Sequence, residues 1–396
     1  MTGDGGEEQK TIANIVGRIA DIPAASWDAC ANPDAATFNP FITHAFLKAL
    51  EDSGCVGSSH TGWIPQHIAV PDDAGEIVAC APCYLKLDSA GEYVFDHSWA
   101  AAYERAGGRY YPKLQIAVPF TPVPGRRLLV RPGPDAEQNE HVLAAAAVQL
   151  AQRHGASSVH ITFLTEHEWK VLGAAGYLQR TDQQFHWSNA GYQSFDDFLA
   201  SLASRKRKAV RKERSEATSD GIVIEQLSGA DIQEKHWDAF FEFYTDTGNR
   251  KWGRPYLNRR FFSMLGTSMA DHCLLVMARR GDRYIAGALN LIGGDCLFGR
   301  YWGAVEQHPC LHFELCYYQA IDYAIAHRLA RVEAGAQGEH KLARGYMPTP
   351  TYSVHFIANP SFHNAVARYL EGERAAIAEN ITDLAAFAPY RRGEQS

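Results

Sequence analysis

The chain lacks several features that would place a protein of 396 residues in a special class. Its eight cysteines are too few for a disulfide-dense scaffold. No apolar run approaches the ~18 residues of a membrane-spanning helix, and no basic segment leads into an apolar one, as in a secretory signal. The net charge of −7 argues against a general DNA-binding protein. We therefore expect a cytoplasmic globular protein of two or three domains.

Two stretches of the chain show the same order of predicted elements. The first is predicted to contain strands at 68–70 and 77–87 around a polar turn, a helix at 141–154 and a strand at 159–163. The second is predicted to contain strands at 274–278 and 284–292, a helix at 313–329 and a strand at 331–334. Any α/β chain alternates in this way, but the matching order favours an internal duplication.

A basic segment, Ser204–Arg214, lies between the two stretches, and seven of its eleven residues are Lys or Arg. On a helix, Arg207 and Arg211 share one face, and Lys208 and Lys212 share another. In an acidic chain, such a concentration is typical of a phosphate-binding surface. A solvated helix whose charges are balanced by neighbouring acids explains the pattern equally well.

The segment Glu333–Tyr346 follows a predicted strand end, where ligand sites form in α/β sheets. Small residues separate its charged groups and allow a ligand to approach the backbone. Glu339 and His340 are rival candidates for a general base, and Lys341 is a candidate for stabilising an oxyanion or a phosphate. Alternatively, the charges are solvated and His340 caps the next helix.

Two other segments carry candidate binding residues. Arg250, Lys251, Trp252 and Arg254 combine cations with an aromatic ring, which suits a nucleotide or phosphate, or else a surface loop anchored by Trp252. Asp96–His97 could form an oriented acid–base pair or a structural hydrogen bond. The histidines and cysteines lack metal-ligand spacing, so no metal site is predicted.

Several long segments resemble the Fem-type branch of the GNAT superfamily, and within it a bacterial family of predicted N-acyltransferases. The segments are Asn39–Leu47, Glu92–Trp99, Arg109–Pro122, Ser204–Arg214, Asp246–Tyr256, Gly299–Gly303 and Glu333–Tyr346. The resemblance covers about Ile19 to Tyr390 and implies an α/β (α+β) fold of two tandem GNAT-like domains, each a mixed, mostly antiparallel sheet flanked by helices. The expected boundaries are a disordered segment 1–11, a first domain 12–195, a basic connecting helix 196–221, a second domain 222–390 and a tail 391–396.

The resemblance also implies transfer of an acyl or aminoacyl group from acyl-CoA or aminoacyl-tRNA to an amine, such as a cell-envelope precursor or a peptide. It implies no tightly bound cofactor. The nearest match to the CoA pyrophosphate loop, [RQ]-x-x-G-x-[GA], is Arg300–Val305, whose final valine weakens the case for acetyl-CoA.

The resulting site prediction places Lys341, His340 and Glu339 in catalysis. Donor binding is assigned to Arg207, Lys208, Arg211, Arg300 and Gly303. Acceptor binding is assigned to Asn39, His44, Asp96, His97, Arg250, Lys251, Trp252, Arg254, Tyr301, Gln337 and Arg344. A competing hypothesis is a catalytically silent GNAT-like module that binds nucleotide or RNA through the basic helix. A third hypothesis, peripheral contact of the basic helix with a membrane, has less support, because that helix lacks a clear apolar face.

Overall fold

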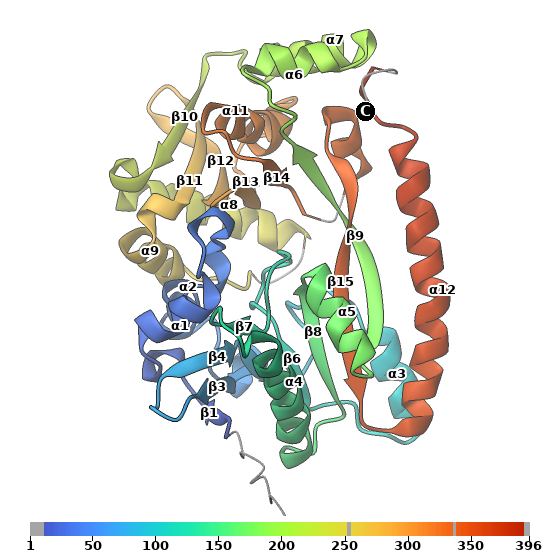
Figure 1. The fold of residues 1–396 in the computed structure, drawn as a ribbon. Coiled ribbons are helices and arrows are strands. Elements are labelled where there is room, and N and C mark those ends of the chain that lie inside the picture. The colour runs from blue at the N-terminus through green and yellow to red at the C-terminus, as the bar shows by residue number, and fades with distance from the viewer. Residues whose placement is uncertain (1–11, 252–254, 336–337, 392–396) are drawn as a thin grey trace, which may run out of the picture.

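The computed structural model describes residues 12–251, 255–335 and 338–391, in full except for the side chains of 249–251 and 339. The predicted disordered segment 1–11, most of the tail, and the candidates Trp252, Arg254 and Gln337 lie outside this range, as do the side chains of Arg250, Lys251 and Glu339. The described strands form a four-stranded sheet, β1-β3-β4-β7, and an eleven-stranded sheet, β10-β11-β12-β13-β14-β9-β15-β8-β6-β5-β2. Figure 1 shows both sheets with their covering helices.

The first half contributes strands to both sheets. Its strands are β1 (Asn14–Val16), β2 (Trp63–Pro65), β3 (His67–Pro71), β4 (Ile77–Ala81), β5 (Cys83–Lys86), β6 (Lys113–Ile116), β7 (Leu129–Val130), β8 (Ser158–Leu164) and β9 (Leu178–Ser188). Its helices are α1 (Ala24–Ala31), α2 (His44–Asp52), α3 (His97–Arg105), α4 (Ala136–Arg153) and α5 (Glu166–Ala174). The single strand predicted at 77–87 is wrong: Pro82 separates β4 from β5, which belong to different sheets. Proline has no N–H for a ladder hydrogen bond, so a break at this residue is expected.

The second half follows two helices, α6 (Phe195–Ser201) and the basic helix α7 (Ser204–Ala217). Its strands are β10 (Ile222–Ser228), β11 (Cys273–Arg280), β12 (Arg283–Ile292), β13 (Cys296–Ala304), β14 (Arg331–Glu333) and β15 (Met347–Ile357). Its α-helices are α8 (Glu234–Lys251), α9 (Arg259–Ser268), α10 (Leu311–Phe313), α11 (Gln319–Ala326) and α12 (Pro360–Ala385). The predicted helix at 313–329 contains a π-helical turn, Glu314–Tyr318, between α10 and α11. Such turns are rare and frequent at functional sites.

The two halves exchange strands. β15, near the C-terminus, lies between β8 and β9 of the first half and pairs antiparallel with both. β9 in turn pairs with β14 of the second half. The alternating order predicted for each half is confirmed, but the large sheet runs through both, so residues of β9 lie beside residues of β14.

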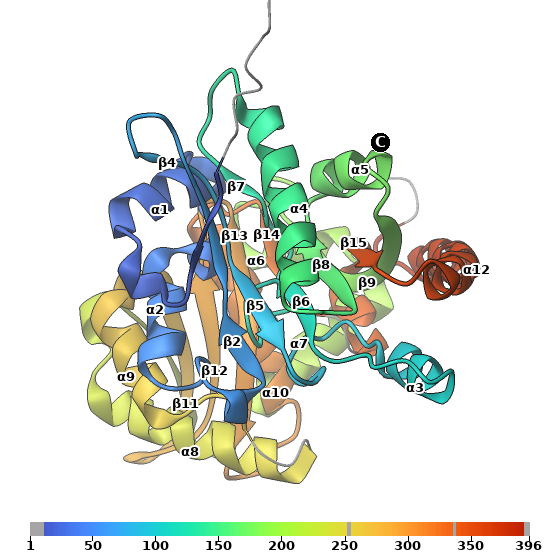
Figure 2. The same cartoon turned by 90° about the horizontal axis from the view of Figure 1, so that it is seen from below.

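An apolar core also joins the halves. The Phe46 ring of α2 meets the Phe261 ring of α9 edge to face at 5.8 Å, and Phe41 meets Phe298 of β13 at 5.4 Å. All four side chains are buried. Figure 2 shows α2 of the first half lying beside α9 of the second. The halves therefore pack through a continuous hydrophobic contact, which stabilises their relative position.

Strands β13 and β14 separate after a short parallel pairing. The pairing ends at Phe298 and Glu333, whereas β13 continues to Ala304. The register between β12 and β13 also shifts at this point, because Leu289 faces Tyr301 and Asn290 faces Gly299, which leaves Arg300 as a bulge. A bulge re-aims side chains and increases local twist. The result is a split in the sheet, bordered by β13, β14 and the segment that follows β14.

Candidate functional site

A pocket of about 400 Å³ lies beside the far end of β13. Its walls come from α8, from β13, and from the connection between β13 and α10. The lining residues are Thr247, Trp302, Ala304, Glu306, Gln307, His308, Leu311 and His312. An aromatic ring, an aliphatic side chain and a few polar groups are the usual lining of a small-molecule site.

Lys341 lies in a 3₁₀ helix, Glu339–Arg344, that follows the split. The side chain is buried, and its Nζ donates hydrogen bonds to the carbonyl oxygens of Ala334 and, at 3.1 Å, Gly335. Burial lowers the pKa of Lys341 from 10.5 to about 8. The predicted catalytic lysine is therefore a buried amine that ties its own helix to the end of β14.

His340 is exposed at the start of the same helix. Its Nε2 lies 3.0 Å from the Tyr317 hydroxyl, which belongs to the π-helical turn. Partial burial, and then the charges of Arg344 and Lys341, lower the pKa of His340 below its usual 6.5. The ring is therefore mostly neutral at pH 7 and able to accept a proton. No hydrogen bond in which the His340 ring caps a helix is found among the described contacts.

His312 connects the pocket to His340 and was missed by sequence reasoning. Its ring lies 5.1 Å from that of Trp302 in the pocket wall and 6.1 Å from that of His340. Because a lone histidine just before a predicted helix has no distinctive neighbours in sequence, only the fold identifies it as a site residue.

Arg344 is held by structural contacts. Its guanidinium forms an ion pair with Glu213 of α7 at 2.9 Å, donates to the His340 carbonyl oxygen at 2.7 Å, and lies 3.4 Å from the Phe313 ring centroid. These contacts connect the basic helix directly to the helix that carries Lys341. Its predicted role in substrate binding stays a prediction.

The basic helix has some of its charges paired with acids and others exposed, and its predicted binding of phosphate stays a prediction. Arg211 pairs with Asp196 at 3.0 Å, and Arg214 pairs with Glu314 and Asp322 at 2.9 and 2.6 Å. Lys208 and Lys212 are exposed one turn apart, and Arg207 is half-buried. Part of the positive charge therefore stabilises the fold, and part of it faces solvent.

Arg300, Tyr301 and Gly303 lie within β13 and not in a loop. Arg300 and the Tyr301 hydroxyl both donate to the Phe120 carbonyl oxygen of the first half, at 2.9 and 3.2 Å. The predicted phosphate loop at Arg300–Val305 is therefore wrong as local structure, because residues 300–304 are strand and Gly303 is in register with Gly287 on β12. The connection that follows β13 begins after Ala304.

Gly303 allows close contact between β13 and α8. A Cβ at this position would lie 2.2 Å from the Phe243 carbonyl oxygen, so we expect Gly303→Ala to lower the free energy of unfolding by about 1–3 kcal/mol. Gly372→Ala on α12 is the matched control, because its Cβ would meet nothing within 4 Å. That change should stabilise the helix by up to about 1 kcal/mol. Urea denaturation measures both, and equal stability of the two variants would contradict the expected clash.

The first-half candidates Asn39 and His44 make local contacts. Asn39 caps a 3₁₀ turn, since its Oδ1 accepts from the Phe41 N–H at 3.0 Å. The His44 Nε2 lies 2.9 Å from the Ile19 carbonyl oxygen. Both side chains are buried in the first half, so their predicted contact with an acceptor stays a prediction.

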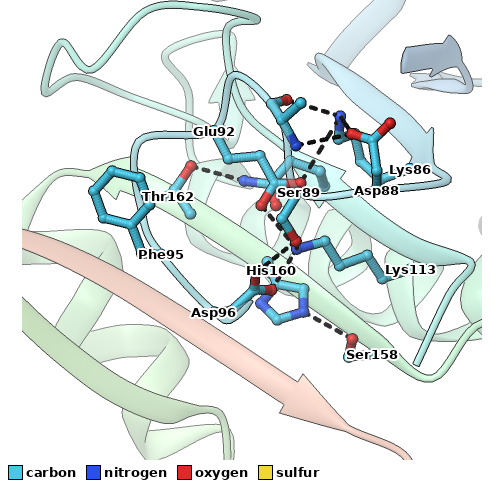
Figure 3. A network of polar contacts seen from close by, with 12 residues as sticks. Lys86, Asp88, Ser89, Glu92, Phe95, Asp96, Lys113, Ser158, His160 and Thr162 are labelled. Atoms are coloured by element: carbon cyan, nitrogen blue, oxygen red, sulfur yellow. Dashed lines mark hydrogen bonds and ion pairs between the residues drawn. The ribbon is translucent and has the colours of Figure 1, made fainter. Parts of the chain in front are cut away.

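Asp96 does not pair with His97. It accepts hydrogen bonds from Ser89 and Tyr110, each at 2.6 Å, and from Lys113 (Figure 3). His97 is exposed, and its ring lies 6.2 Å from that of Phe95. The two residues therefore form neither the acid–base pair nor the mutual hydrogen bond considered for them, and Asp96 is hydrogen-bonded to other residues.

Asp96 is part of a buried ionic network in the first half (Figure 3). The fully buried Lys113 also donates to Glu92 at 2.7 Å and to Ser89 at 2.8 Å. Nearby, the fully buried Lys86 lies 3.9 Å from the Trp63 ring centroid. Burial lowers the pKa of Lys86 to about 8. Sequence reasoning missed both lysines, because each occupies an otherwise apolar strand.

Among residues 12–251, 255–335 and 338–391 there is no cluster of His, Cys, Asp or Glu that could hold a metal ion. None of the helices within these ranges is long and apolar enough to cross a membrane. Cys80 and Cys83 have the spacing of a redox motif, but burial raises the pKa of the Cys83 thiol to about 12, which opposes such a role.

Comparison with known proteins agrees with this architecture. The profile of the FemAB-like family, described as peptidoglycan biosynthesis/recognition, matches residues 18–392. FemX aligns with a TM-score of 0.52 and 13% identity, over 87% of this chain and 98% of that chain. The C-terminal domain of a putative lysylphosphatidylglycerol synthetase from Agrobacterium fabrum aligns with a TM-score of 0.54 and 9% identity, over 88% and 96%. No curated protein sequence matches significantly. The two structural similarities establish a shared fold.

Proposed function

The chain belongs to the FemAB-like family, and we propose that it transfers an acyl or aminoacyl group from an activated donor to an amine of a peptidoglycan precursor. One observation carries the proposal. At the split between β13 and β14, a buried lysine is held by the Ala334 and Gly335 carbonyl oxygens beside the Tyr317–His340 pair. These groups supply a cation and a proton carrier at one place.

Amide formation needs an uncharged amine, a carbonyl held at attack distance, and stabilisation of the tetrahedral oxyanion. Lys341 would stabilise the oxyanion, because an ammonium group buried at this depth interacts more strongly than one in water. The Tyr317–His340 pair would pass a proton to the leaving group. The pocket bordered by Trp302 and His312 would hold the transferred group or the adjoining part of the donor.

Incubation of the purified protein with donors and acceptors tests the proposal. The donors are radiolabelled acyl-CoAs and charged tRNAs, and the acceptors are peptidoglycan precursors, free peptides and polyamines. We expect label to appear in an amide that resists hydroxylamine, which cleaves esters and thioesters. Failure of every donor–acceptor combination to yield such an amide would contradict the proposal.

The exposed face of α7 suits a nucleic-acid donor. Lys208 and Lys212 lie on the helix that Glu213 connects to Arg344, close to the proposed transfer site. If aminoacyl-tRNA is the donor, Lys208→Glu/Lys212→Glu should weaken tRNA binding and make the plot of log K against log salt less steep by about 2 units, since each lost phosphate contact removes about 0.9.

Filter binding at several salt concentrations measures this change. Lys170→Glu/Lys235→Glu changes the net charge equally at two exposed lysines away from α7 and should leave the slope unaltered. If both double variants have the same slope, the change in salt dependence is due to net charge and not to α7. If Lys208→Glu/Lys212→Glu binds tRNA as tightly as the wild-type protein, acyl-CoA is favoured as the donor.

A further inference from the structure

Glu333 and His186 form a buried polar pair that the roles above leave unused. Glu333 is the last residue of β14 and lies opposite His186 of β9 in the strand register. The two side chains come from different halves of the chain and are brought together by the exchange of strands. Glu333 is only 4% exposed and His186 only 9%.

One carboxylate oxygen of Glu333 lacks a hydrogen bond. Arg331 Nε donates to its Oε1 at 3.3 Å, whereas Oε2 is buried without a hydrogen-bond partner among the described residues. The nearest cation-forming atom recorded for Oε2 is His186 Nε2, at 3.9 Å, which is beyond hydrogen-bond reach. An unsatisfied buried acceptor costs about 1–3 kcal/mol, and more when charged. Folded proteins seldom leave a buried acceptor unsatisfied, and a ligand that donates a hydrogen bond would complete the bonding of Glu333.

The Glu333–His186 pair lies on the face of the sheet that meets the first half of the chain. Register partners on neighbouring strands share a face, so His186, Glu333 and Phe298 point the same way. The Phe41 ring of the first half contacts Phe298 and lies 5.7 Å from the Arg300 guanidinium, which places Arg300 on this face too. The Nε of Arg300 is also buried without a partner among the described residues. An unpaired acceptor and an unpaired donor therefore occur on one face of the split sheet.

His186 is suited to accept a proton. Burial lowers its pKa below 6.5; the nearby Glu333 opposes this, and Arg331 and Lys341 add to it. The ring is therefore neutral at pH 7. Its Nε2 has only a long contact, 3.4 Å, with the Gln184 amide oxygen. A neutral imidazole beside a carboxylate can take a proton while the carboxylate keeps its charge.

We propose that Glu333 and His186 form the binding site for the acceptor, a primary amine that arrives as an ammonium ion. This inference rests on the proposed transferase function and names the acceptor group. Glu333 Oε2 would accept an N–H of the ammonium, and His186 would take one proton from it. The uncharged nitrogen would then attack the donor carbonyl, forming the C–N bond as the bond to oxygen or sulfur breaks. The nitrogen's second proton would pass through Tyr317–His340 to the leaving group.

Kinetics of Glu333→Gln test the assignment within the active enzyme. Glutamine keeps the shape and the bond to a donor but not the charge, so we expect kcat/KM for the acceptor to fall by about 10²–10³. KM for the donor should stay within about twofold. Asp295→Asn is the matched control, because Asp295 is the other carboxylate bound to Arg331 and is half-exposed. Equal losses in the two variants, or a loss confined to the donor KM, would overturn the assignment.

Binding of small amines separates this inference from the transferase function. The probe is L-alaninamide, and its control is N-acetyl-L-alaninamide, which has a similar shape but no ammonium. Calorimetric titration should show at least tenfold tighter binding of the amine to the wild-type protein, and this preference should disappear in Glu333→Gln. If the protein prefers the amine over its N-acetylated control but transfers no group, the amine site is supported and the transferase function is contradicted. If the protein transfers a group but shows no such preference, only the amine site is contradicted.

Misfolding is checked separately. Circular dichroism and the thermal midpoint of Glu333→Gln should match those of the wild-type protein within a few degrees, because removing a poorly satisfied buried charge costs little. If Glu333→Gln unfolds, His186→Gln provides the second test, because it removes the proposed proton acceptor and should lower the rate of transfer. Unchanged transfer by a folded His186→Gln variant would overturn the role of the pair.

Discussion

Replacing Lys341 with methionine should lower kcat/KM at least 100-fold and change the free energy of unfolding at pH 7 by no more than about 2 kcal/mol. The activity falls because the buried cation proposed to stabilise the oxyanion is lost. Stability changes little because two effects oppose each other. A pKa lowered from 10.5 to about 8 corresponds to a cost of roughly 3 kcal/mol for keeping the lysine charged. The variant removes this cost but also loses the hydrogen bonds to Ala334 and Gly335.

The dependence of stability on pH provides an independent measurement of Lys341. Its folded-state pKa is below the unfolded value, so between pH 8 and 10.5 the unfolded chain binds more protons. Wild-type stability should therefore rise relative to Lys341→Met across this window, by up to about 3 kcal/mol. Urea titrations of both proteins at pH 7 to 10 isolate the difference, since Lys86 titrates alike in both. Full activity of the Lys341→Met variant would show that Lys341 does not take part in the reaction.

Replacing Lys113 with methionine should lower the free energy of unfolding by about 3–5 kcal/mol. Lys113 is fully buried between Glu92 and Asp96. Burial alone would lower its pKa, but these two carboxylates more than compensate and raise it. The variant removes the cation between two buried carboxylates and leaves Glu92 with only the more distant Lys86, at 3.9 Å. Urea or thermal denaturation measures the loss.

Two controls separate the loss of the ion pair from the loss of packing. The triple variant Lys113→Met/Glu92→Gln/Asp96→Asn removes all three charges and should recover most of the stability. Lys170→Met breaks an exposed pair with Glu166 and should change stability by less than about 1 kcal/mol. A Lys113→Met protein as stable as the wild type would show that the network contributes no net stabilisation.

Local patterns were sufficient to predict much of the fold. The order of strand, helix and strand in each half follows from apolar periodicity, and the helix predicted at 141–154 is present within α4, Ala136–Arg153. The expected helix at Ser204–Arg214 is present as α7. Periodicity reports only which face of an element is buried, so it could not predict that Pro82 divides one strand between two sheets or that β15 inserts between β8 and β9.

The candidate site was predicted in part for the same reason. Lys341 and His340 are found together at the end of β14, because glycines and charges close in sequence mark a turn beside a strand end. His312 and His186 were not predicted, since their contacts with His340 and Glu333 join residues more than twenty positions apart in sequence. Arg344 pairs with Glu213, a partner that no local pattern could indicate, and its predicted contact with the substrate stays a prediction.

The sequence alone determined the kinds of elements, their order, the basic helix and the polar segment after β14, because these depend on neighbours along the chain. Only the tertiary structure decided which polar groups meet. The exchange of strands brings Glu333 against His186, and the pairing of β13 with β14 ends at Phe298. Burial gives Lys341 its lowered pKa. Solvation and charge pairing depend on distance in space, and that distance is set by packing between segments far apart in sequence.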